Sequence, residues 1–260
     1  MESDSPLVQI GINKIGSSIF SRLIANAKSK DWDNCFIMLH KQARMHKEIQ
    51  GLANFLFYNN NLETREEFHW QIEKYSQYSI NSQSEFLKKI LSSRLVFVNT
   101  RQEFDSKRNL SEAKFIRNFI TRLFEEMPNA INQKTVGVIS PFRLQCAEIL
   151  RSVPQKFQDF VSIDTVERFQ GSERDIILFS YSSNYNYELE MSSDIELIEN
   201  QLIDRKLNVA ITRAREHLII LGCQRVLDKS LIHKKLINYI KYNGLIMDIS
   251  EIENKFEKNC

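Results

Sequence analysis

The sequence predicts a doubly wound α/β fold, in which helices cover both faces of a central parallel sheet. Five short runs rich in Val, Ile, Leu or Phe have the length and composition of buried parallel strands. Helical patterns lie between these runs, and strands that alternate with helices indicate crossover connections within a parallel sheet. The predicted strands cover residues 94–99, 135–140, 160–163, 175–180 and 217–222.

The clearest helical pattern covers residues 111–127, where apolar side chains recur at intervals of three and four. Ser111 is a suitable N-cap for this helix, and Pro128 directly follows its end. Residues 143–153 and 202–213 show the same pattern. These three helices supply connections that the predicted sheet requires.

The first ninety residues look wholly helical, with shorter helices expected at residues 18–27 and 45–58. The charged and aromatic stretch at residues 63–91 reads as an insertion or as a flank over the sheet edge. The predicted organisation is therefore a helical N-terminal region at 1–92, an α/β core at 93–228 and closing helices at 229–260.

The composition limits the classes of function. The 260 residues carry a net charge of only +2, so any basic surface for a nucleic-acid partner must be local. The four cysteines form no CxxC pair and have no histidine at zinc-ligand spacing, which predicts reduced thiols, no metal site and a cytoplasmic location. No apolar run approaches the roughly 20 residues that cross a bilayer, so no membrane partner is expected.

Residues 11–18 (GINKIGSS) have the glycine spacing of a phosphate-binding P-loop. That motif requires Lys and then Ser or Thr after the second glycine, and Ser17 stands where the Lys should be. Without this ammonium, the charge of the β- and γ-phosphates is unmatched. The segment is therefore interpreted as a turn that leads into a helix.

Residues 164–175 (DTVERFQGSERD) follow one predicted strand and lead into the next. Gly171 permits a tight turn there, Glu173 can accept hydrogen bonds from a ribose, and Thr165 with the local amides can hold a phosphate. Considered alone, such a charged cluster is more typical of a solvated loop.

Residues 205–215 (RKLNVAITRAR) place Arg213 and Arg215 at the end of a helix. Doubly wound sheets bind ligands at the carboxyl ends of their strands, and we expect both arginines at that edge. A guanidinium there can stabilise the charge on a γ-phosphoryl group in transfer. The alternative is a helix C-terminus that simply carries favourable cations.

Residues 39–49 (LHKQARMHKEI) place Arg44 and His46 before or at the start of a helix. Arg44 is a candidate for a second phosphate contact. Considered alone, a solvated basic helix start is the simpler interpretation.

Taken together, these segments resemble the C-terminal half of superfamily 1B helicases, in the branch of the nonsense-mediated-decay helicase, from about residue 18 to residue 227. LHKQARMHKEI is similar to the QYRMHP element of that family, and FYNNNL to its F-Y-x-x-x-L. DTVERFQGSERDIILFS resembles motif V and RKLNVAITRAREHLIILG resembles motif VI, which are long and specific. SKRNLSEA and VGVISPFRLQ resemble the S-x-x-N-x-x-E-A segment and motif IV.

The resemblance implies a RecA-like domain of the P-loop NTPase type and a role for each matching residue. It implies that Arg213 is an arginine finger for ATP and that Arg44 is a further γ-phosphate contact. Glu173 is expected to bind the ribose, with Gln170 and Gly171 shaping that loop. Asn208 and Arg215 are expected to support motif VI. The residues expected to face single-stranded nucleic acid are Ser140, Pro141, Phe142, Arg143 and Thr165.

Two departures affect nucleotide binding. Ala43 replaces the adenine-stacking tyrosine of QYRMHP, and Lys47 replaces its proline. The P-loop, the Walker B strand and motif III of the family precede the segment that this chain matches, so we expect Met1 to mark a truncated start. ATP and Mg²⁺ are then bound mainly by a first RecA-like domain, and this chain alone should be inactive, because phosphoryl transfer needs that machinery as well as the finger.

Two other functions stay open at this stage. The first is a helicase-derived, non-catalytic module that binds nucleic acid or protein, which the lost tyrosine and the lack of a P-loop favour. The second is a phosphate-binding α/β enzyme unrelated to helicases. It needs its own general base, and neither His46 nor His217 has an obvious acid partner in the sequence.

Overall fold

The computed structural model describes residues 19–65, 71–73, 76–198 and 201–256. The chain forms two compact units, residues 1–40 and residues 41–260. In the first unit the described elements are the helix α2 (Ile19–Ser29) and the short 3₁₀ helix η1 (Asp33–Cys35). All the predicted site residues lie in the second unit.

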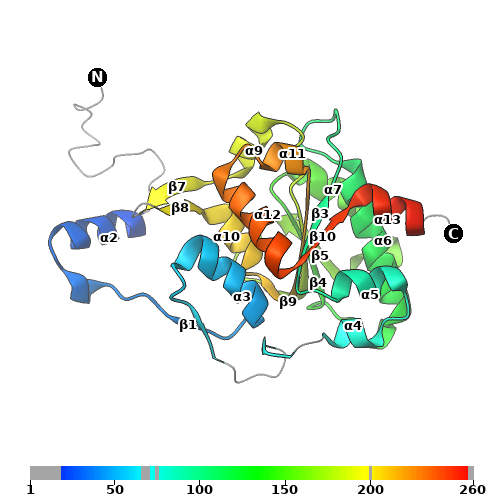
Figure 1. Ribbon diagram of the computed structural model, residues 1–260, viewed down its shortest axis with the longest axis horizontal. Helices are drawn as coiled ribbons and strands as arrows, with labels where there is room; N and C mark the ends of the chain where they lie inside the picture. The colour runs from blue at the N-terminus through cyan, green and yellow to red at the C-terminus, as the bar shows by residue number, and fades with distance from the viewer. Residues whose placement is uncertain (1–18, 66–70, 74–75, 199–200, 257–260) are drawn as a thin grey trace. The chain divides into compact units, whose positions relative to one another are not determined.

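The second unit is built on a six-stranded sheet in the order β10-β3-β9-β6-β4-β5, and every neighbouring pair is parallel (Figure 1). Five of these strands are the predicted ones, which confirms the predicted fold class. The strands are β3 (Leu95–Asn99), β4 (Val136–Ser140), β5 (Val161–Thr165), β6 (Arg174–Ser180), β9 (Ala214–Gly222) and β10 (Leu245–Asp248).

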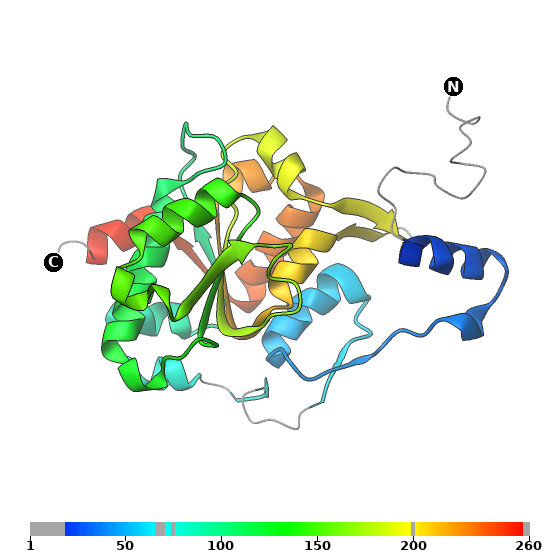
Figure 2. The same ribbon diagram turned by 180° about the vertical axis from the view of Figure 1, so that it is seen from behind.

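Two apolar cores cover the two faces of this sheet (Figures 1 and 2). Successive side chains of a strand point to opposite faces. In β3, Leu95 and Phe97 therefore join one core, while Val96 and Val98 join the other. Because both faces are covered, the strands read as continuous apolar runs rather than as alternating ones.

One face is covered by the helices that carry much of the predicted site. Their buried side chains, such as Ile49 in α3 and Leu236 in α12, pack against the odd-numbered residues of β3. Residues 41–92 thus contribute directly to the core of the second unit. The elements on this face are α3 (Lys47–Ala53), the π-helix η2 (Asn54–Tyr58), α9 (Asn186–Ser192), α10 (Arg205–Ile211), α11 (Gln224–Leu227) and α12 (Leu231–Asn243).

The opposite face is dominated by α6, whose apolar side chains are buried along its length. The prediction of Ser111 as its N-cap is wrong. The helix begins one residue earlier, and the Asn109 side chain accepts a hydrogen bond from the amide of Glu112 at 3.0 Å. The elements on this face are α4 (Gln77–Asn81), α5 (Glu85–Leu91), α6 (Leu110–Glu126), η4 (Pro128–Ala130), α7 (Arg143–Ser152), α8 (Gln155–Gln158) and α13 (Ile249–Phe256).

Two further sequence expectations need correction. The segment predicted as a helix from residue 202 begins with β8 (Gln201–Asp204), which forms an antiparallel pair with β7 (Ile195–Ile198). The helix starts only at Arg205, because the Asp204 carboxylate caps the amides of Lys206 and Leu207. The closing segment, predicted as helices alone, also supplies the edge strand β10.

The N-terminal part of the second unit is not wholly helical. Short strands β1 (Lys41–Gln42) and β2 (Glu63–Thr64) pair in parallel, and the stretch at 63–91, expected to be helical, contains the two short helices α4 and α5. The predicted turn at residues 11–18 lies outside the described residues. Among the described helices, none has the length and apolar character needed to cross a membrane.

Candidate functional site

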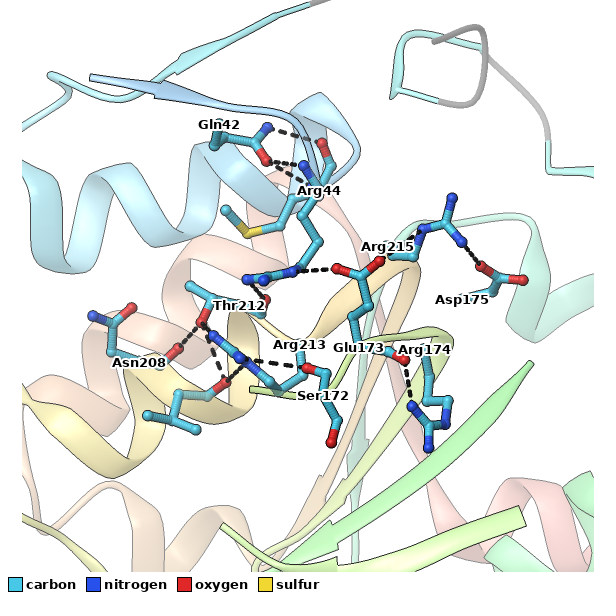
Figure 3. Close-up of polar contacts among 12 residues, drawn as sticks. Gln42, Arg44, Ser172, Glu173, Arg174, Asp175, Asn208, Thr212, Arg213 and Arg215 are labelled. Carbon is cyan, nitrogen blue, oxygen red and sulfur yellow. Dashed lines mark hydrogen bonds and ion pairs between the residues drawn. The ribbon is translucent and has the colours of Figure 1, made fainter. Parts of the chain in front are cut away.

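Four predicted residues, Arg44, Glu173, Arg213 and Arg215, lie together beside the first residues of β6 and β9 (Figure 3). Glu173 directly precedes β6 and Arg213 directly precedes β9, and these strands pair through Arg174 and Ala214. The expectation that the arginines lie at the carboxyl edge is therefore wrong. A crossover helix returns the chain to the amino end of a parallel sheet, so the end of α10 must lie at the amino edge.

Hydrogen bonds to the backbone hold Arg44 in position, independently of its side chain. The Gln42 side-chain oxygen accepts hydrogen bonds from the amides of Arg44 at 2.8 Å and Met45 at 2.7 Å. His46 then caps α3, and its own amide donates to the carbonyl of Arg215 at 2.7 Å. The hydrogen bond from His46 ties the start of α3 to the start of β9. Arg44 is thereby held close to Arg213 and Arg215, which follow α10.

The Arg44 side chain bridges two predicted segments. Its Nε donates to Glu173 Oε2 at 2.6 Å, and its Nη1 donates to the carbonyl of Thr212 at 3.1 Å. Arg215 Nε lies 3.9 Å from the other oxygen of Glu173, while Arg215 Nη1 bonds to Asp175 at 3.0 Å. The single carboxylate of Glu173 thus lies between two guanidinium groups.

Arg213 has a different environment from its two neighbours. Its guanidinium and Nε donate only to neutral oxygens: the carbonyl of Val209 at 3.2 Å, the carbonyl of Ser172 at 3.3 Å and the hydroxyl of Thr212 at 3.1 Å. Within the described part of the chain, no carboxylate lies at ion-pair distance from it. Burial, and after it the positive charge of Arg44, lower the pKa of Arg213, although a guanidinium stays charged at neutral pH.

This arrangement favours an anionic ligand. A partly buried cation that has only neutral acceptors and a second cation nearby gains strongly from a negatively charged group. Phosphate oxygens match the planar fork of a guanidinium, and Arg44 and Arg213 present two such forks within one cluster.

Asn208 supports the cluster indirectly, through its contacts with Tyr58 and Thr212. Its Nδ2 lies 3.2 Å from Tyr58 Oη, which ties α10 to η2, and its carbonyl accepts a hydrogen bond from Thr212 Oγ1 at 2.8 Å. Asn208 makes no direct hydrogen bond with Arg213 in the described structure. Its contribution is to fix the end of α10, from which Arg213 projects.

Gln170 and Gly171 are exposed residues of the loop that precedes Glu173. Gly171 has φ +89°, a conformation that a residue with a Cβ adopts only at a cost. This turn brings the Ser172 carbonyl to Arg213 and the Glu173 carboxylate to Arg44. Gln170 does not join the arginine cluster through any hydrogen bond described here.

The predicted nucleic-acid residues lie at the opposite, carboxyl edge of the sheet. Ser140 and Thr165 end β4 and β5 and face each other in the register of the two strands. Ser140, Phe142 and Thr165 are buried, so they shape the segment from inside. Arg143 is exposed and Pro141 is half-buried, so these two residues present their side chains to solvent.

Sequence reasoning missed the residues that orient the arginines. Gln42, Ser172 and Thr212 act through backbone groups or short side chains, and these residue types alone carry no signal for that role. The family resemblance marked FYNNNL, which contains Tyr58, and it marked Asn208 separately. It did not show that these two side chains are hydrogen-bonded. Only the fold brings these positions together.

Neither His46 nor His217 is placed to act as a general base near neutral pH. Burial, and then Arg94, lower the pKa of His46 to about 4, and its ring caps α3 and contacts the carbonyl of Glu73 at 3.0 Å. Burial lowers the pKa of His217 to about 3. In the described residues, no carboxylate forms an ion pair with either ring, and no group of His, Cys, Asp and Glu side chains could hold a metal ion.

Known proteins are similar to most of this chain. The family described as "AAA domain" matches residues 15–225. The chain is 29% identical over 266 residues to "Helicase sen1" of Schizosaccharomyces pombe, covering 95% of this chain and 15% of that protein. It is also 29% identical over 265 residues to "DNA replication ATP-dependent helicase/nuclease DNA2" of Bos taurus, covering 93% of this chain and 23% of that protein.

A third relative, "DNA polymerase alpha-associated DNA helicase A" of Schizosaccharomyces pombe, is 27% identical over 247 residues, which is 89% of this chain and 34% of that protein. The chain therefore spans about a third or less of the length of these three relatives. The matches confirm the predicted resemblance to a helicase domain.

Proposed function

This chain belongs to the AAA domain family, and we propose that it is the second motor domain of an ATP-dependent superfamily 1 helicase. In this role Arg213 is the arginine finger and Arg44 is a second γ-phosphate contact. Glu173 binds the ribose, and Arg215 supports the finger by holding Asp175 beside the cluster. The substrate class is single-stranded nucleic acid.

The observation that carries this proposal is the environment of Arg213. It is the cluster arginine with only neutral hydrogen-bond acceptors, and it lies beside Arg44. An added negative charge at this point, such as a γ-phosphate, compensates the charges of Arg213 and Arg44 together. An arginine placed in this way stabilises the charge that develops as the phosphoryl group leaves.

The rest of the chemistry must come from elsewhere. Phosphoryl transfer needs a lysine and Mg²⁺ on the phosphates and a group that positions the attacking water. The 260 residues contain no G-x-x-x-x-G-K-[ST] segment, because Ser17 follows the second glycine of residues 11–18. ATP and Mg²⁺ are thus bound mainly by a first RecA-like domain, and this chain alone hydrolyses no ATP above background.

Nucleotide binding closes the two domains because the arginines gain phosphate contacts only in the closed state. Arg44 exchanges its bond with Glu173 for the phosphate, and Glu173 is then available to the ribose. Residues 165–174 run from the carboxyl end of β5 to the amino end of β6. A shift at Glu173 therefore acts on the segment that begins with Thr165 at the nucleic-acid edge.

The test is Arg213→Ala in a motor with both RecA-like domains present. We expect nucleotide binding to persist and turnover to fall by about 10³-fold or more. Arg117→Ala is the matched control, because Arg117 is an exposed arginine on α6, on the other face of the sheet. A fluorescent nucleotide reports binding and phosphate release reports turnover. Unchanged turnover in Arg213→Ala removes the finger role, and the proposed function with it.

A further inference from the structure

The loop at residues 100–109, between β3 and α6, carries the most exposed aromatic side chain among the described residues. Phe104 is 97% exposed, whereas eight other phenylalanines are buried in the two cores. The loop and α9 project side by side from the same end of the sheet (Figures 1 and 2). Tyr185, the N-cap of α9, donates from its hydroxyl to the carbonyl of Phe104 at 3.0 Å.

The loop is held rigidly although its tip is in solvent. Asn184 Nδ2 donates to the carbonyls of Asp105 at 2.7 Å and Arg108 at 2.8 Å. Glu188 accepts a hydrogen bond from the amide of Lys107 at 2.7 Å, and Asn184 and Glu188 are fully buried. The exposure of Phe104 is therefore imposed by the structure rather than being a property of a loose segment.

A buried carboxyl group supports this loop from below. Glu112, at the start of α6, accepts hydrogen bonds from Thr100 at 3.1 Å, Ser180 at 2.6 Å and the amide of Ser182 at 3.0 Å. It thereby joins the carboxyl ends of β3 and β6 beneath the loop. Every oxygen of this carboxyl group is used, so its role is to hold the loop in place.

Two residues of this region have left-handed backbones without being glycine. Lys107 has φ 58° and Ser182 has φ 45°, and the amide of each is held by a buried Glu. Such conformations are strained for a residue with a Cβ and persist where the surroundings impose them, often at functional sites.

The acidic side chains near Phe104 are engaged in local contacts, whereas two nearby basic side chains are not paired with them. Glu103 is used to cap α6, where it accepts from the amides of Leu110 and Ser111, and Asp105 pairs with Arg108 at 2.7 Å. By contrast, the cations of Lys107 and Arg143 have no carboxylate at ion-pair distance in the described structure. These two cations suit phosphate groups.

The loop also adjoins the segment already predicted to face nucleic acid. Gln145, in the first turn of α7, exchanges two hydrogen bonds with the backbone of Asn109, at 2.9 Å and 3.0 Å. Arg143 begins this same helix. Tyr185, whose hydroxyl donates to the Phe104 carbonyl, stacks on Tyr187 with ring centroids 5.6 Å apart, and Tyr187 is half-exposed.

We propose that Phe104, flanked by Tyr187, is a base-stacking contact for single-stranded nucleic acid, with Lys107 and Arg143 on the adjoining phosphates. The proposal rests on the proposed function, since it extends the nucleic-acid edge of that motor domain. Proteins that bind single strands without sequence preference combine such stacking aromatics with backbone-tracking cations. Because every base has a π-face, the contact should tolerate sequence.

The experiment uses the 260-residue chain and a fluorescein-labelled oligothymidylate of about 12 nucleotides, a length within the usual single-strand site sizes. Fluorescence anisotropy gives the Kd at low and at high salt. Phe104→Ala is expected to weaken binding about fivefold or more at both salt concentrations. Arg143→Ala should instead lower the salt dependence of the Kd, because it removes a phosphate contact. Phe104→Tyr should restore binding.

Tyr242→Ala is the matched control, because Tyr242 is an aromatic residue of α12 that is 83% exposed and away from this loop. Circular dichroism verifies that each variant is folded. An unchanged Kd in Phe104→Ala, beside measurable binding by the unmodified chain, overturns the stacking contact and leaves the proposed function intact. If the unmodified chain binds no oligonucleotide, the nucleic-acid role in the proposed function fails as well.

Discussion

The two edges of the sheet are built on opposite electrostatic principles. At the amino edge, Arg44 and Arg215 lie on either side of the Glu173 carboxylate, whereas Arg213 donates only to neutral acceptors. At the carboxyl edge, every oxygen of the buried Glu112 and Glu188 has a donor. An incompletely balanced cluster can respond to an anion, whereas a satisfied buried network fixes geometry.

This difference indicates that the contacts at the amino edge can rearrange, whereas those at the carboxyl edge are rigid. The exposed Arg44–Glu173 pair contributes little to folding and can break when a phosphate arrives. The network around Glu112 cannot break without leaving buried polar groups unpaired. Residues 165–174 join the two edges, so in the proposed function a change at the arginines acts on the edge that we propose binds nucleic acid.

The largest expected effect tests this contrast in stability. Glu112→Ala leaves the donors of Thr100, Ser180 and Ser182 without their acceptor and should lower the free energy of unfolding by about 3 kcal/mol. Glu173→Ala should lower it by at most about 1 kcal/mol, because its ion pairs are exposed. Urea unfolding followed by circular dichroism measures both. Equal losses in the two variants contradict the contrast.

A smaller effect concerns pH. Burial raises the pKa of Glu112 to about 8, against an ordinary value of 4.5 in the unfolded chain. Between these values the folded state binds the extra proton, so stability should fall as pH rises toward 8, by at most about 1.4 kcal/mol per pH unit. Above pH 8 both states have lost the proton, and this contribution is constant.

Glu112→Gln is the matched variant for this pH effect. Its amide can donate to the Thr100 hydroxyl while its oxygen still accepts from Ser182, as a protonated Glu112 can. The variant should fold at pH 6 with stability close to that of the unmodified chain and lose less of it toward pH 8. Parallel stability curves for the two proteins mean that Glu112 does not titrate in this range.

The smallest expected effect lies at the loop that connects the two edges. Gly171→Ala forces a Cβ into φ +89° and should cost about 1 kcal/mol, although no atom lies within 4 Å of the added carbon. In the two-domain motor we expect a loss of turnover together with weaker nucleotide binding, because Ser172 and Glu173 shift together. Gly137 is no suitable control, since it is packed on several sides. Arg117→Ala, on the exposed face of α6, serves instead.

Much of the fold was predictable because local chemistry and the final structure agree. The five predicted strands are buried on both faces, and that burial demands the continuous apolar runs that the sequence displays. Strand β10 was missed because a four-residue run has no period of its own, and its place beside β3 is set by pairing. The β7–β8 pair was missed because the Asp204 cap was read as helix interior.

The site was predictable as a set of residues but not as an arrangement. Arg44, Glu173 and Arg213 were chosen from long motifs, and the structure brings them together. Their edge was predicted wrongly from a general rule for ligand sites, although the position of Arg213 directly before a strand already implied the amino edge. The loop around Phe104 gave no sequence signal, because an exposed phenylalanine and a buried one look the same in a short segment.

The sequence by itself determined the α/β class, five of the six sheet strands and the charged residues that gather beside β6 and β9, because burial and motif spacing are recorded in local order. Only the tertiary structure decided which cation lacks a carboxylate, which carboxyl group is buried and which aromatic ring faces solvent. The physical reason is that ion pairing and desolvation depend on neighbours far away along the chain, as Arg44 and Glu173 are.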